Sequence, residues 1–470
     1  MPAATHIDLY QLSSFVAHWD AGLAQTPVTM SFFSRRLPRD LEKNPARGYL
    51  LWVGLRRGLE WLADVRFDEA RIETLCSHPM LGPALKARPA LVEALSQWRF
   101  QGTIDAPPEG TPLFAGRATT TDGRLIDVDG VRPSAQTPYL VVQTDLLSAK
   151  LIETPLLSII NHMTMVASKA SRVVAAAGDR AVLEFGQRRT HPEAAVDAAY
   201  AAYIAGCAGS SNVEAHHRHG VPVLGTMDHF AIQSWEQDGV PRHETEGAFF
   251  SAFHRAYPDH SILLVDTYDS YGPLTGIPAA VKATNGKLAG IRLDSRISAE
   301  NITRARQMLD ALGAPQAKIV VSGGMDENSI AALGDAPADA FGVGERIVTS
   351  PDAPVGVGAV GKLCVVDGRP TMKLSRGSGK ATLPGRVQVF RDGGIDRVVR
   401  LGETAPGRPL LETVWDDDGP RPLPSPAAVR EYALSSVAEL PPAAREPRVV
   451  TVAVSDALAQ LITQLVEAKG

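Results

Sequence analysis

The 470-residue chain has few cysteines, little net charge and no long uninterrupted apolar run. Its three cysteines are scattered and include no C-x-x-C pair, which fits a reducing compartment better than a disulfide framework. A net charge of -5 is small for this length, so nothing indicates a surface for nucleic acid. The longest mostly apolar run, residues 194–208, is broken by Asp197 and is too short to span a bilayer. The first residues lack a signal-peptide pattern, and we expect a cytoplasmic protein that binds neither nucleic acid nor membrane.

Two common ligand motifs are also missing. The sequence has no G-x-x-x-x-G-K-[ST] loop, because SRGSGKAT at residues 375–382 has the wrong spacing and no hydroxyl after Lys380. The HHRH run at residues 216–219 has no cysteine or carboxylate cluster to complete a metal site, so a solvated surface is expected. Any ATP would have to bind in another way.

The hydrophobic pattern divides the chain into three parts. Residues 1–137 mix helical and extended segments, which is typical of an α+β domain. Residues 138–352 alternate strands with helices and predict a parallel sheet closed into an irregular β/α barrel. Residues 353–470 begin with a hairpin, GKLCVVDGRPTMKLS, and we expect these C-terminal strands to return to the N-terminal domain. Residues 404–444, rich in proline, glycine and charge, are expected to form a surface connection.

Six apolar runs within the second part are expected to be barrel strands: AVLEF, VPVLGT, SILLVDT, LAGIRL, KIVVSG and DAFGVG. Each run ends in polar residues or glycine, or is followed directly by them. In a β/α barrel the active site is assembled at the C-terminal ends of the strands. The candidate site residues should therefore meet at one edge of the sheet.

Glycine pairs follow the last two of these strands. SGG at residues 322–324 precedes an expected helix near Asp326, and GVG lies at residues 342–344. Glycines at strand ends leave backbone N–H groups free to approach a phosphate closely. A tight turn is the alternative for either pair alone. Their occurrence on successive late strands favours phosphate.

Carboxylates follow two other strands. Asp266 and Asp269 come after ILLV, and Asp294 follows GIRL. Such oxygen ligands suit Mg²⁺ bound to a polyphosphate, and they also suit ribose hydroxyls. Helix N-capping is the alternative, above all for Asp269.

Arginine and histidine side chains complete the expected site. Arg188 and Arg189 after VLEFGQ, and Arg292 within GIRLDS, could bind a carboxylate or phosphate. An internal ion pair with Asp294 is the alternative for Arg292. His229 directly follows an expected strand and could act as a general base, or as a nucleophile whose phosphorylated form stores energy; a structural histidine is the alternative.

Taken in order, FGQRRT, GSSNV, GTMDHF, LLVDTYDS, GIRLDSR, VSGGMDE and FGVGERI resemble the nicotinate phosphoribosyltransferases, which have the type II phosphoribosyltransferase fold. The resemblance extends from IDLYQL, at residue 7, to PGRVQVFR, ending at Arg391. It implies an ATP-coupled ligase of NAD biosynthesis that forms nicotinate mononucleotide and pyrophosphate from nicotinate and phosphoribosyl pyrophosphate. His229 would be the phosphorylated histidine, with Mg²⁺ as cofactor and ATP as co-substrate.

The resemblance also implies how the base is bound. Phe185 would stack on the pyridine ring, while Tyr10 of the partner subunit would pack on its other face in a homodimer with shared active sites. Ser211 stands where nicotinamide-specific relatives carry an aspartate. A neutral hydroxyl there does not repel the carboxylate of nicotinate, which favours the acid.

Catalytic roles are implied for His229, Asp266 and Asp294, of which the two aspartates would meet ribose and Mg²⁺. Arg188 and Arg292 would meet substrate anions. The remaining contacts would come from Gly323, Gly324 and Gly344 to the 5′-phosphate and from Arg35 to pyrophosphate.

Four positions depart from the family pattern: Asp228 and Phe230 flank the histidine, Arg296 replaces a glycine, and Glu345 follows the phosphate glycines. Asp228 keeps open a second base, nicotinamide or another heterocycle. Glu345 and the altered LDSR motif keep open a non-catalytic regulator that binds a phosphoribosyl group.

Overall fold

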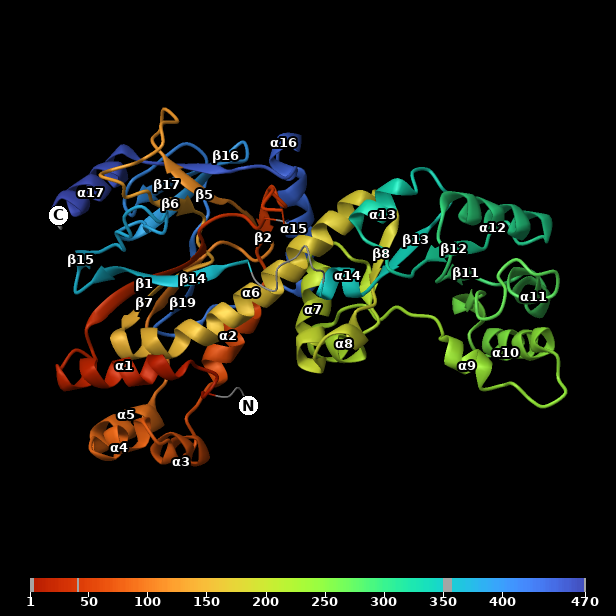
Figure 1. The fold of residues 1–470 in the computed structure, drawn as a ribbon, viewed down its shortest axis with the longest axis horizontal. Helices are drawn as coiled ribbons and strands as arrows, with labels where there is room; N and C mark the ends of the chain where they lie inside the picture. Colours follow the sequence, from red (N-terminus) through yellow and green to blue (C-terminus); the bar gives the residue numbers. More distant parts are fainter. Residues whose placement is uncertain (1–3, 40–41, 350–356, 469–470) are drawn as a thin grey trace. The chain divides into compact units, whose positions relative to one another are not determined.

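The computed structural model describes residues 4–39, 42–349 and 357–468, and the chain forms two compact units. Unit 1 comprises residues 1–168 and 352–470, and unit 2 comprises residues 169–351 (Figure 1). The expected boundary between residues 352 and 353 lies outside the described residues. In the described ranges, no helix has the length and apolar character needed to cross a membrane.

A seven-stranded sheet of unit 1 has the order β15-β14-β1-β7-β3-β19-β20. Its strands are β1 (Pro27–Ser34), β3 (Thr103–Ala106), β7 (Leu140–Asp145), β14 (Ala359–Val366), β15 (Arg369–Pro370), β19 (Glu412–Asp416) and β20 (Gly419–Pro420). The expected hairpin is formed by β14 and β15, and β14 pairs with β1. This pairing confirms that C-terminal strands join the N-terminal region in one α+β domain.

The strand β7 corrects the expected start of the barrel at residue 138. It pairs antiparallel with both β1 and β3, so it belongs to unit 1. The unit boundary instead falls within the long helix α6 (Leu146–Ala177), after Ser168. Its residues, YLVVQ, fall inside the range expected for the barrel because a buried central strand reads as an apolar run in either kind of sheet.

A second sheet of unit 1 has the order β18-β16-β17-β21-β5-β6. Its strands are β5 (Ala115–Thr119), β6 (Ser134–Gln136), β16 (Val387–Asp392), β17 (Ile395–Arg400), β18 (Arg408–Pro409) and β21 (Thr451–Val454); the short strands β2 (Leu50–Leu51) and β4 (Pro112–Leu113) pair separately. Residues 404–444 are therefore not a mere surface connection. They contain β18, β19, β20 and the helix α15 (Pro426–Ala438), with Trp415 and Ala433 buried.

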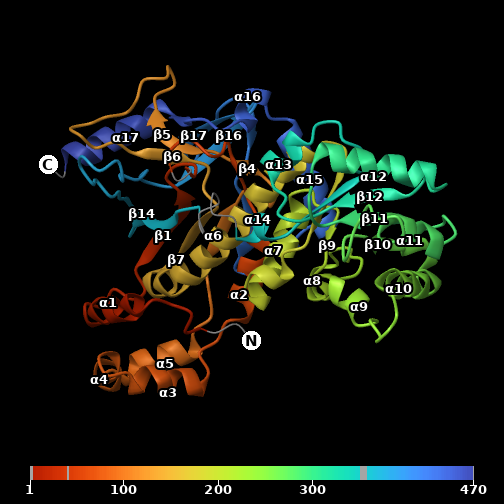
Figure 2. The same ribbon diagram turned by 45° about the vertical axis from the view of Figure 1, so that its right-hand side comes forward.

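The other helices of unit 1 are α1 (Leu9–Asp20), α2 (Leu55–Asp64), α3 (Glu69–Ser77), α4 (Leu81–Lys86), α5 (Pro89–Gln97), α16 (Pro442–Arg445) and α17 (Asp456–Glu467). The helices α3, α4 and α5 form a small group next to α1 (Figure 2). Ser455 caps α17 by accepting the Leu458 N–H, and Leu458, Ile462 and Val466 are its buried stripe.

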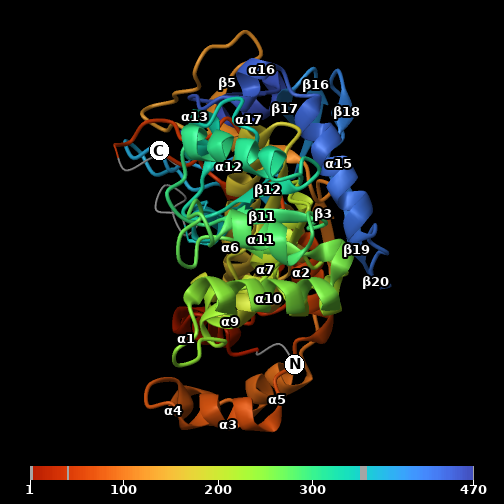
Figure 3. The ribbon, with the colours of Figure 1, turned by 90° about the vertical axis from the view of Figure 1, so that its right-hand side faces the viewer.

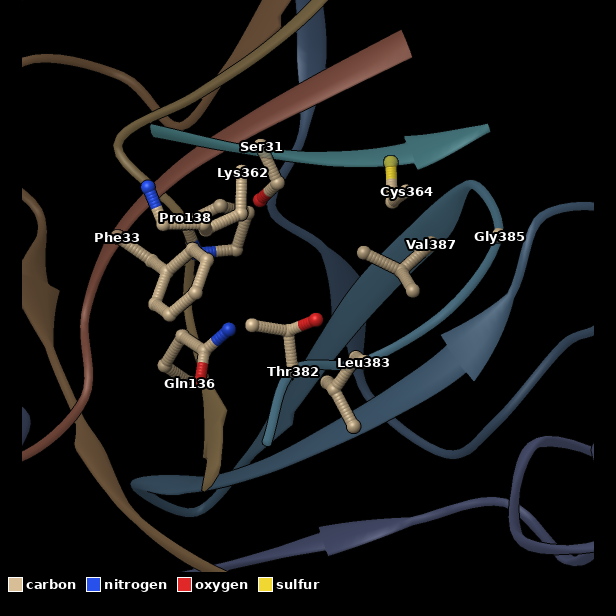
Figure 4. A pocket seen from close by; sticks show the side chains of 10 residues that line it. All are labelled: Ser31, Phe33, Gln136, Pro138, Lys362, Cys364, Thr382, Leu383, Gly385 and Val387. Carbon is tan, nitrogen blue, oxygen red and sulfur yellow. The ribbon is translucent and has the colours of Figure 1, made fainter. Parts of the chain in front are cut away.

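Unit 1 also contains a small cavity, shown in Figure 4, lined by Gln136, Lys362, Cys364 and Thr382 among others. Its volume of about 10 Å³ is room for one water molecule, so it is too small for a substrate. Burial raises the pKa of the Cys364 thiol to about 12, which keeps this cysteine unreactive.

Unit 2 contains a parallel sheet of order β10-β11-β12-β13-β8-β9. Its strands are β8 (Ala181–Glu184), β9 (Gly209–Ser210), β10 (Ile262–Leu264), β11 (Gly290–Leu293), β12 (Lys318–Val321) and β13 (Ala340–Val343). Five of the six expected runs are strands. The sixth, VPVLGT, makes only an isolated bridge between Ser210 and Val223, while the two-residue β9 was too short to show a pattern.

The VPVLGT segment, together with Met227 that follows it, connects the two ends of this sheet. The Leu224 N–H donates to the Ser210 carbonyl oxygen at 2.9 Å, and the Leu264 N–H reaches the Met227 sulfur at 3.5 Å. One segment thus contacts both β9 and β10. The sheet is an irregular barrel, as expected.

The helices of unit 2 are α7 (Pro192–Ile204), α8 (Val213–His219), α9 (His229–Gln233), α10 (Arg242–Ala256), α11 (Ile277–Ala283), α12 (Ala299–Ala311), α13 (Glu327–Ala332) and α14 (Glu345–Val348), with 3₁₀ turns η1 (Gln187–Arg189) and η2 (Pro258–His260). In Figure 3, α10, α11 and α12 cover one side of the sheet. They follow or precede the neighbouring strands β10 and β11. The connections between these strands and helices carry the candidate site.

Unit 1 contains a buried ion pair whose contribution to the free energy of unfolding can be tested. Arg391 donates to both carboxylate oxygens of Asp396, at 2.6 and 2.9 Å, and both side chains are buried. Asp396→Ala would leave the guanidinium charge buried without its partner. We expect a loss of about 3–5 kcal/mol in the free energy of unfolding, measured by urea denaturation. The control is Asp416→Ala, which breaks an exposed pair with Arg421 and should leave the midpoint unchanged; equal effects of the two variants would contradict the prediction.

Candidate active site

The polar residues expected at the barrel mouth lie at one edge of the unit 2 sheet. Because the strands are parallel, their C-terminal ends meet at this edge. Asp266 follows β10, Asp294 follows β11, and Gly323, Gly344 and Phe185 follow β12, β13 and β8. Strand pairing alone therefore brings these residues together.

His229 is the first residue of α9 and lies between the two aspartates. Its Nε2 atom is 4.0 Å from Asp266 Oδ1 and 3.9 Å from Asp294 Oδ2. Its Nδ1 atom is 3.0 Å from the hydroxyl of Thr267. The ring is thus held at Nδ1 while Nε2 faces two carboxylates, and its side chain remains 40% exposed. This geometry leaves Nε2 available to a substrate.

Asp266 is the more buried of the two aspartates, with a side chain only 3% exposed. Its Oδ2 accepts the Asp294 N–H at 3.1 Å and the Ser295 hydroxyl at 2.6 Å. Its Oδ1 is buried and has no hydrogen-bond partner in the part of the chain that the structure describes. An orphaned carboxylate oxygen of this kind fits a cation or a ligand hydroxyl.

The acids at this edge suit a cation shared with a substrate. Among the described residues, no three His, Cys, Asp or Glu side chains are arranged to hold a metal by themselves. Mg²⁺ usually takes one or two carboxylates and completes its shell with water and substrate phosphates. Asp266 and Asp294 therefore fit Mg²⁺ in that mode.

Arg292 supplies positive charge beside these acids. Its Nη1 donates to the Thr226 hydroxyl at 2.7 Å, and its Nε is buried without a hydrogen-bond partner among the described residues. Burial lowers the pKa of its guanidinium, and the charge of Arg188 acts in the same direction, while Asp294 opposes the shift. Its hydrogen bond to Thr226 rather than to Asp294 leaves the guanidinium able to receive an anion.

The glycines at this edge permit very close backbone packing. Gly323 has φ +96°, and a Cβ there would lie 2.1 Å from the Asp294 carbonyl oxygen. A Cβ on Gly344 would lie 2.7 Å from the Phe185 carbonyl oxygen. Gly324, also at positive φ, has open space where its side chain would be. The three glycines thus offer a surface without side chains, which is what close binding of a phosphate requires.

The Phe185 side of the edge is held by a buried acid that the sequence reading missed. Glu184 accepts the Ser210 hydroxyl at 2.6 Å and the Gly186 N–H, and burial raises the pKa of its carboxyl group. These bonds tie the ends of β8 and β9, which carry Phe185 and Ser211. An acid inside the apolar run AVLEF was the available signal, since a buried carboxylate needs partners.

A second missed residue is Glu246 of α10, which is fully buried. Its Oε2 accepts the Gly276 N–H at 2.7 Å, just before α11 begins. Asp269, expected as a ligand or a helix cap, instead organises the loop between β10 and α11. Its Oδ1 accepts the Tyr271 N–H at 3.1 Å, and the cap position of α11 is Gly276.

Three departures from the family pattern are accommodated by the local structure. Asp228 caps α9 by accepting the Ala231 N–H at 3.0 Å. Glu345 is exposed and lies 3.8 Å from Arg189, so its charge has a cation nearby. Arg296 replaces a glycine at φ +53°, a left-handed conformation that costs a non-glycine residue about 1 kcal/mol. Phe230 is 75% exposed, and nothing in the structure explains it.

Tyr10 and Arg35 belong to unit 1. Tyr10 is 53% exposed on α1, and its hydroxyl accepts the Gln11 amide at 3.1 Å. Arg35 directly follows β1, its Nε is buried without a hydrogen-bond partner among the described residues, and burial lowers the pKa of its guanidinium. Both side chains can receive a ligand, and their roles stay predictions.

A parallel barrel whose carboxyl edge brings close-packed glycines beside paired aspartates agrees with the resemblance to phosphoribosyltransferases of the type II fold. Family models agree: the nicotinate phosphoribosyltransferase N-terminal domain matches residues 5–161, and the quinolinate phosphoribosyl transferase C-terminal domain matches residues 166–353.

Individual relatives carry the comparison further. The chain is 40% identical over 390 residues to nicotinate phosphoribosyltransferase pncB1 of Mycobacterium tuberculosis, covering 83% of this chain and 78% of the relative. It is 32% identical to the Bacillus subtilis nicotinate phosphoribosyltransferase, covering 82% and 72% of the two chains. The chain therefore belongs to the nicotinate phosphoribosyltransferase family.

Solved structures show the same fold. The crystal structure of human nicotinic acid phosphoribosyltransferase matches with a TM-score of 0.78 and 26% identity, covering 97% of this chain and 99% of the human one. The nicotinate-nucleotide pyrophosphorylase from Pyrococcus furiosus matches with a TM-score of 0.69 at 22% identity, over 93% and 95% of the two chains, which supports the fold alone.

The raised pKa of Glu246 predicts that the stability of the protein depends on pH. Burial, together with the charges of Asp266 and Asp269, raises its pKa from 4.5 to about 7. The folded protein then keeps a proton that the unfolded chain releases, so its stabilisation is full below pH 4.5 and is lost as the pH rises through about 7. Glu246→Gln stays neutral. Relative to wild type, its free energy of unfolding should rise by at most about 3 kcal/mol between pH 5 and 8, measured by urea denaturation; parallel pH profiles would contradict this.

Proposed function

We propose that this chain transfers the phosphoribosyl group of phosphoribosyl pyrophosphate to nicotinate. The observation that carries the proposal is the placement of His229 Nε2 within 4.0 Å of both Asp266 and Asp294. In the reaction the pyridine nitrogen forms a bond to ribose C1′. The C1′–oxygen bond to pyrophosphate breaks, and pyrophosphate leaves with the electron pair.

The site residues would bind and orient the reactants. Asp294 and Asp266 would accept ribose hydroxyls and stabilise the positive charge that develops at C1′ as the leaving group departs. Gly323, Gly324 and Gly344 would present backbone N–H groups to the 5′-phosphate. Asp266 and Asp294 would hold Mg²⁺, and the ion would neutralise charge on pyrophosphate.

Substrate anions would be met by arginines. Arg188 and Arg292 would bind anionic groups of the substrates, and Arg35 would reach pyrophosphate. We also propose a homodimer in which Tyr10 of the partner subunit packs on a pyridine ring that stacks on Phe185. An aromatic pair of this kind orients the ring and excludes water from the reacting nitrogen.

ATP coupling would use the free nitrogen of His229. When the Nδ1–H donates a hydrogen bond to the Thr267 hydroxyl, the lone pair lies on Nε2, which can attack the γ-phosphorus of ATP. The Nε2–phosphorus bond forms, the bond to ADP breaks, and later attack by water returns the histidine and releases phosphate. The carboxylates near Nε2 would repel the phosphoryl group, which makes it energy-rich.

Two substitutions separate the transfer reaction from its coupling to ATP. Asp294→Asn should lower kcat/KM for nicotinate mononucleotide formation by about 10²–10³-fold, because the charge that stabilises the transition state is removed. His229→Asn should abolish the stimulation by ATP while a reaction without ATP persists. Product and ADP release are measured in parallel with nicotinate, phosphoribosyl pyrophosphate and Mg²⁺.

The matched controls are Asp335→Asn and His217→Asn, which change exposed residues of unit 2 and should behave as wild type. Wild-type turnover excludes a non-catalytic regulator. No product from nicotinate, nicotinamide or quinolinate would overturn the proposed activity. Quinolinate is included because the model that matches residues 166–353 is named for it.

Base choice gives a further prediction. Ser211→Asp would place a carboxylate beside that of nicotinate, and like charges in contact cost several kcal/mol. We expect kcat/KM for nicotinate to fall at least about 100-fold, while nicotinamide is much less affected. Competition between the acid and the amide measures the ratio. Ser211→Ala is the control, and an unchanged ratio in Ser211→Asp would show that Ser211 does not face the base.

A further inference from the structure

Glu246 is fully buried, although the residues around it in sequence, HETEG, are mostly polar. Its Oε2 holds the Gly276 N–H, and its Oε1 is buried without a hydrogen-bond partner among the described residues. Burying a carboxyl group with one backbone partner is costly. Buried polar groups with such a cost are found mainly at functional sites.

The loop that Glu246 contacts runs from Asp266 to Gly276. The loop begins with Asp266 and Thr267, the two residues that face the nitrogens of His229. It ends at Gly276, which adopts φ +59°, and a Cβ there would lie 2.4 Å from the Asp269 carbonyl oxygen. The loop therefore closes tightly on its own backbone, and its closing residue is attached to α10 through Glu246.

Apolar packing between α10 and α11 does not require this bond. Phe250 of α10 is buried, as are Ile277, Ala280 and Val281 of α11. These side chains can hold the two helices together after Glu246 is changed. The Glu246–Gly276 hydrogen bond instead fixes where the loop ends.

We propose that Glu246 is a positioning residue of the reaction: by accepting the Gly276 N–H, it holds the loop that places Asp266 and Thr267 around His229. The inference rests on the proposed function, since it assigns Asp266 to the phosphoribosyl substrate. It acts through Asp266 and touches no substrate. Residues of the base pocket, at the ends of β8 and β9, are held separately by Glu184.

The test compares Glu246→Ala with Glu246→Gln in the full chain at one pH. The glutamine keeps an oxygen that can accept the Gly276 N–H, whereas alanine leaves this amide unpartnered. Loss of a residue that orients a metal ligand, as Glu246 would do for Asp266, typically costs 10–100-fold in metal affinity or activity. Glu246→Ala should lose about 10–100-fold in kcat/KM for phosphoribosyl pyrophosphate, with KM for nicotinate within about twofold of wild type.

Glu246→Gln should restore kcat/KM to within about threefold of wild type. The control is Thr245→Val, because Thr245 is the adjacent buried residue of α10 and its hydroxyl has no hydrogen-bond partner among the described residues. It should leave both kinetic parameters unchanged. Wild-type kinetics in Glu246→Ala, equal losses in the alanine and glutamine variants, or parallel rises of both KM values would each overturn the proposal.

Two further measurements keep the inference testable if a variant or the assay fails. If Glu246→Ala does not fold, Glu246→Asp replaces it, because its shorter side chain cannot reach Gly276; it should show the same selective loss. If the wild type turns over no base, the proposed function fails by itself. Hydrogen exchange of residues 266–276 and calorimetric binding of phosphoribosyl pyrophosphate then test the role of Glu246. Glu246→Ala should accelerate exchange and weaken binding, and Glu246→Gln should do neither.

Discussion

The close contact of backbone at the carboxyl edge of the barrel is the constraint on which the site depends. Gly323 packs against the Asp294 carbonyl, and Gly344 packs against the Phe185 carbonyl, at separations that leave no room for a Cβ. Because adjacent strand ends touch here, the acid of one strand and the aromatic ring of another are brought beside a side-chain-free surface. Any larger residue at Gly323 would separate β11 from β12 and displace Asp294.

Three buried acids then hold the loops that this edge supports. Glu184 ties β8 to β9, Asp266 ties its own strand end to Asp294 and Ser295, and Glu246 ties α10 to the start of α11. Each acid pays a desolvation cost that only partly returns as hydrogen bonds. Among the described residues, one buried oxygen of Asp266 and one of Glu246 have no hydrogen-bond partner, which is a cost that stability alone does not explain.

The positions where this chain departs from its family are locally accommodated. Asp228 caps a helix, Glu345 lies near Arg189, and Arg296 holds a glycine-like conformation while the Asn301 side chain donates to its carbonyl oxygen. None of these changes displaces Asp266, Asp294 or the glycines from the edge of the sheet. The departures are therefore compatible with an intact phosphoribosyl site.

The sequence by itself determined five of the six strands of the barrel sheet and the residues at their ends, because apolar runs that stop at glycine or charge are recognisable locally. Tertiary structure alone decided which sheet takes such a run: YLVVQ of β7 reads like a barrel strand, but its partners lie in unit 1. Glu246 lies in a polar segment yet is buried, and its partner is the Gly276 N–H of the distant loop between β10 and α11. Burial and pairing depend on contacts between distant segments, which local patterns do not contain.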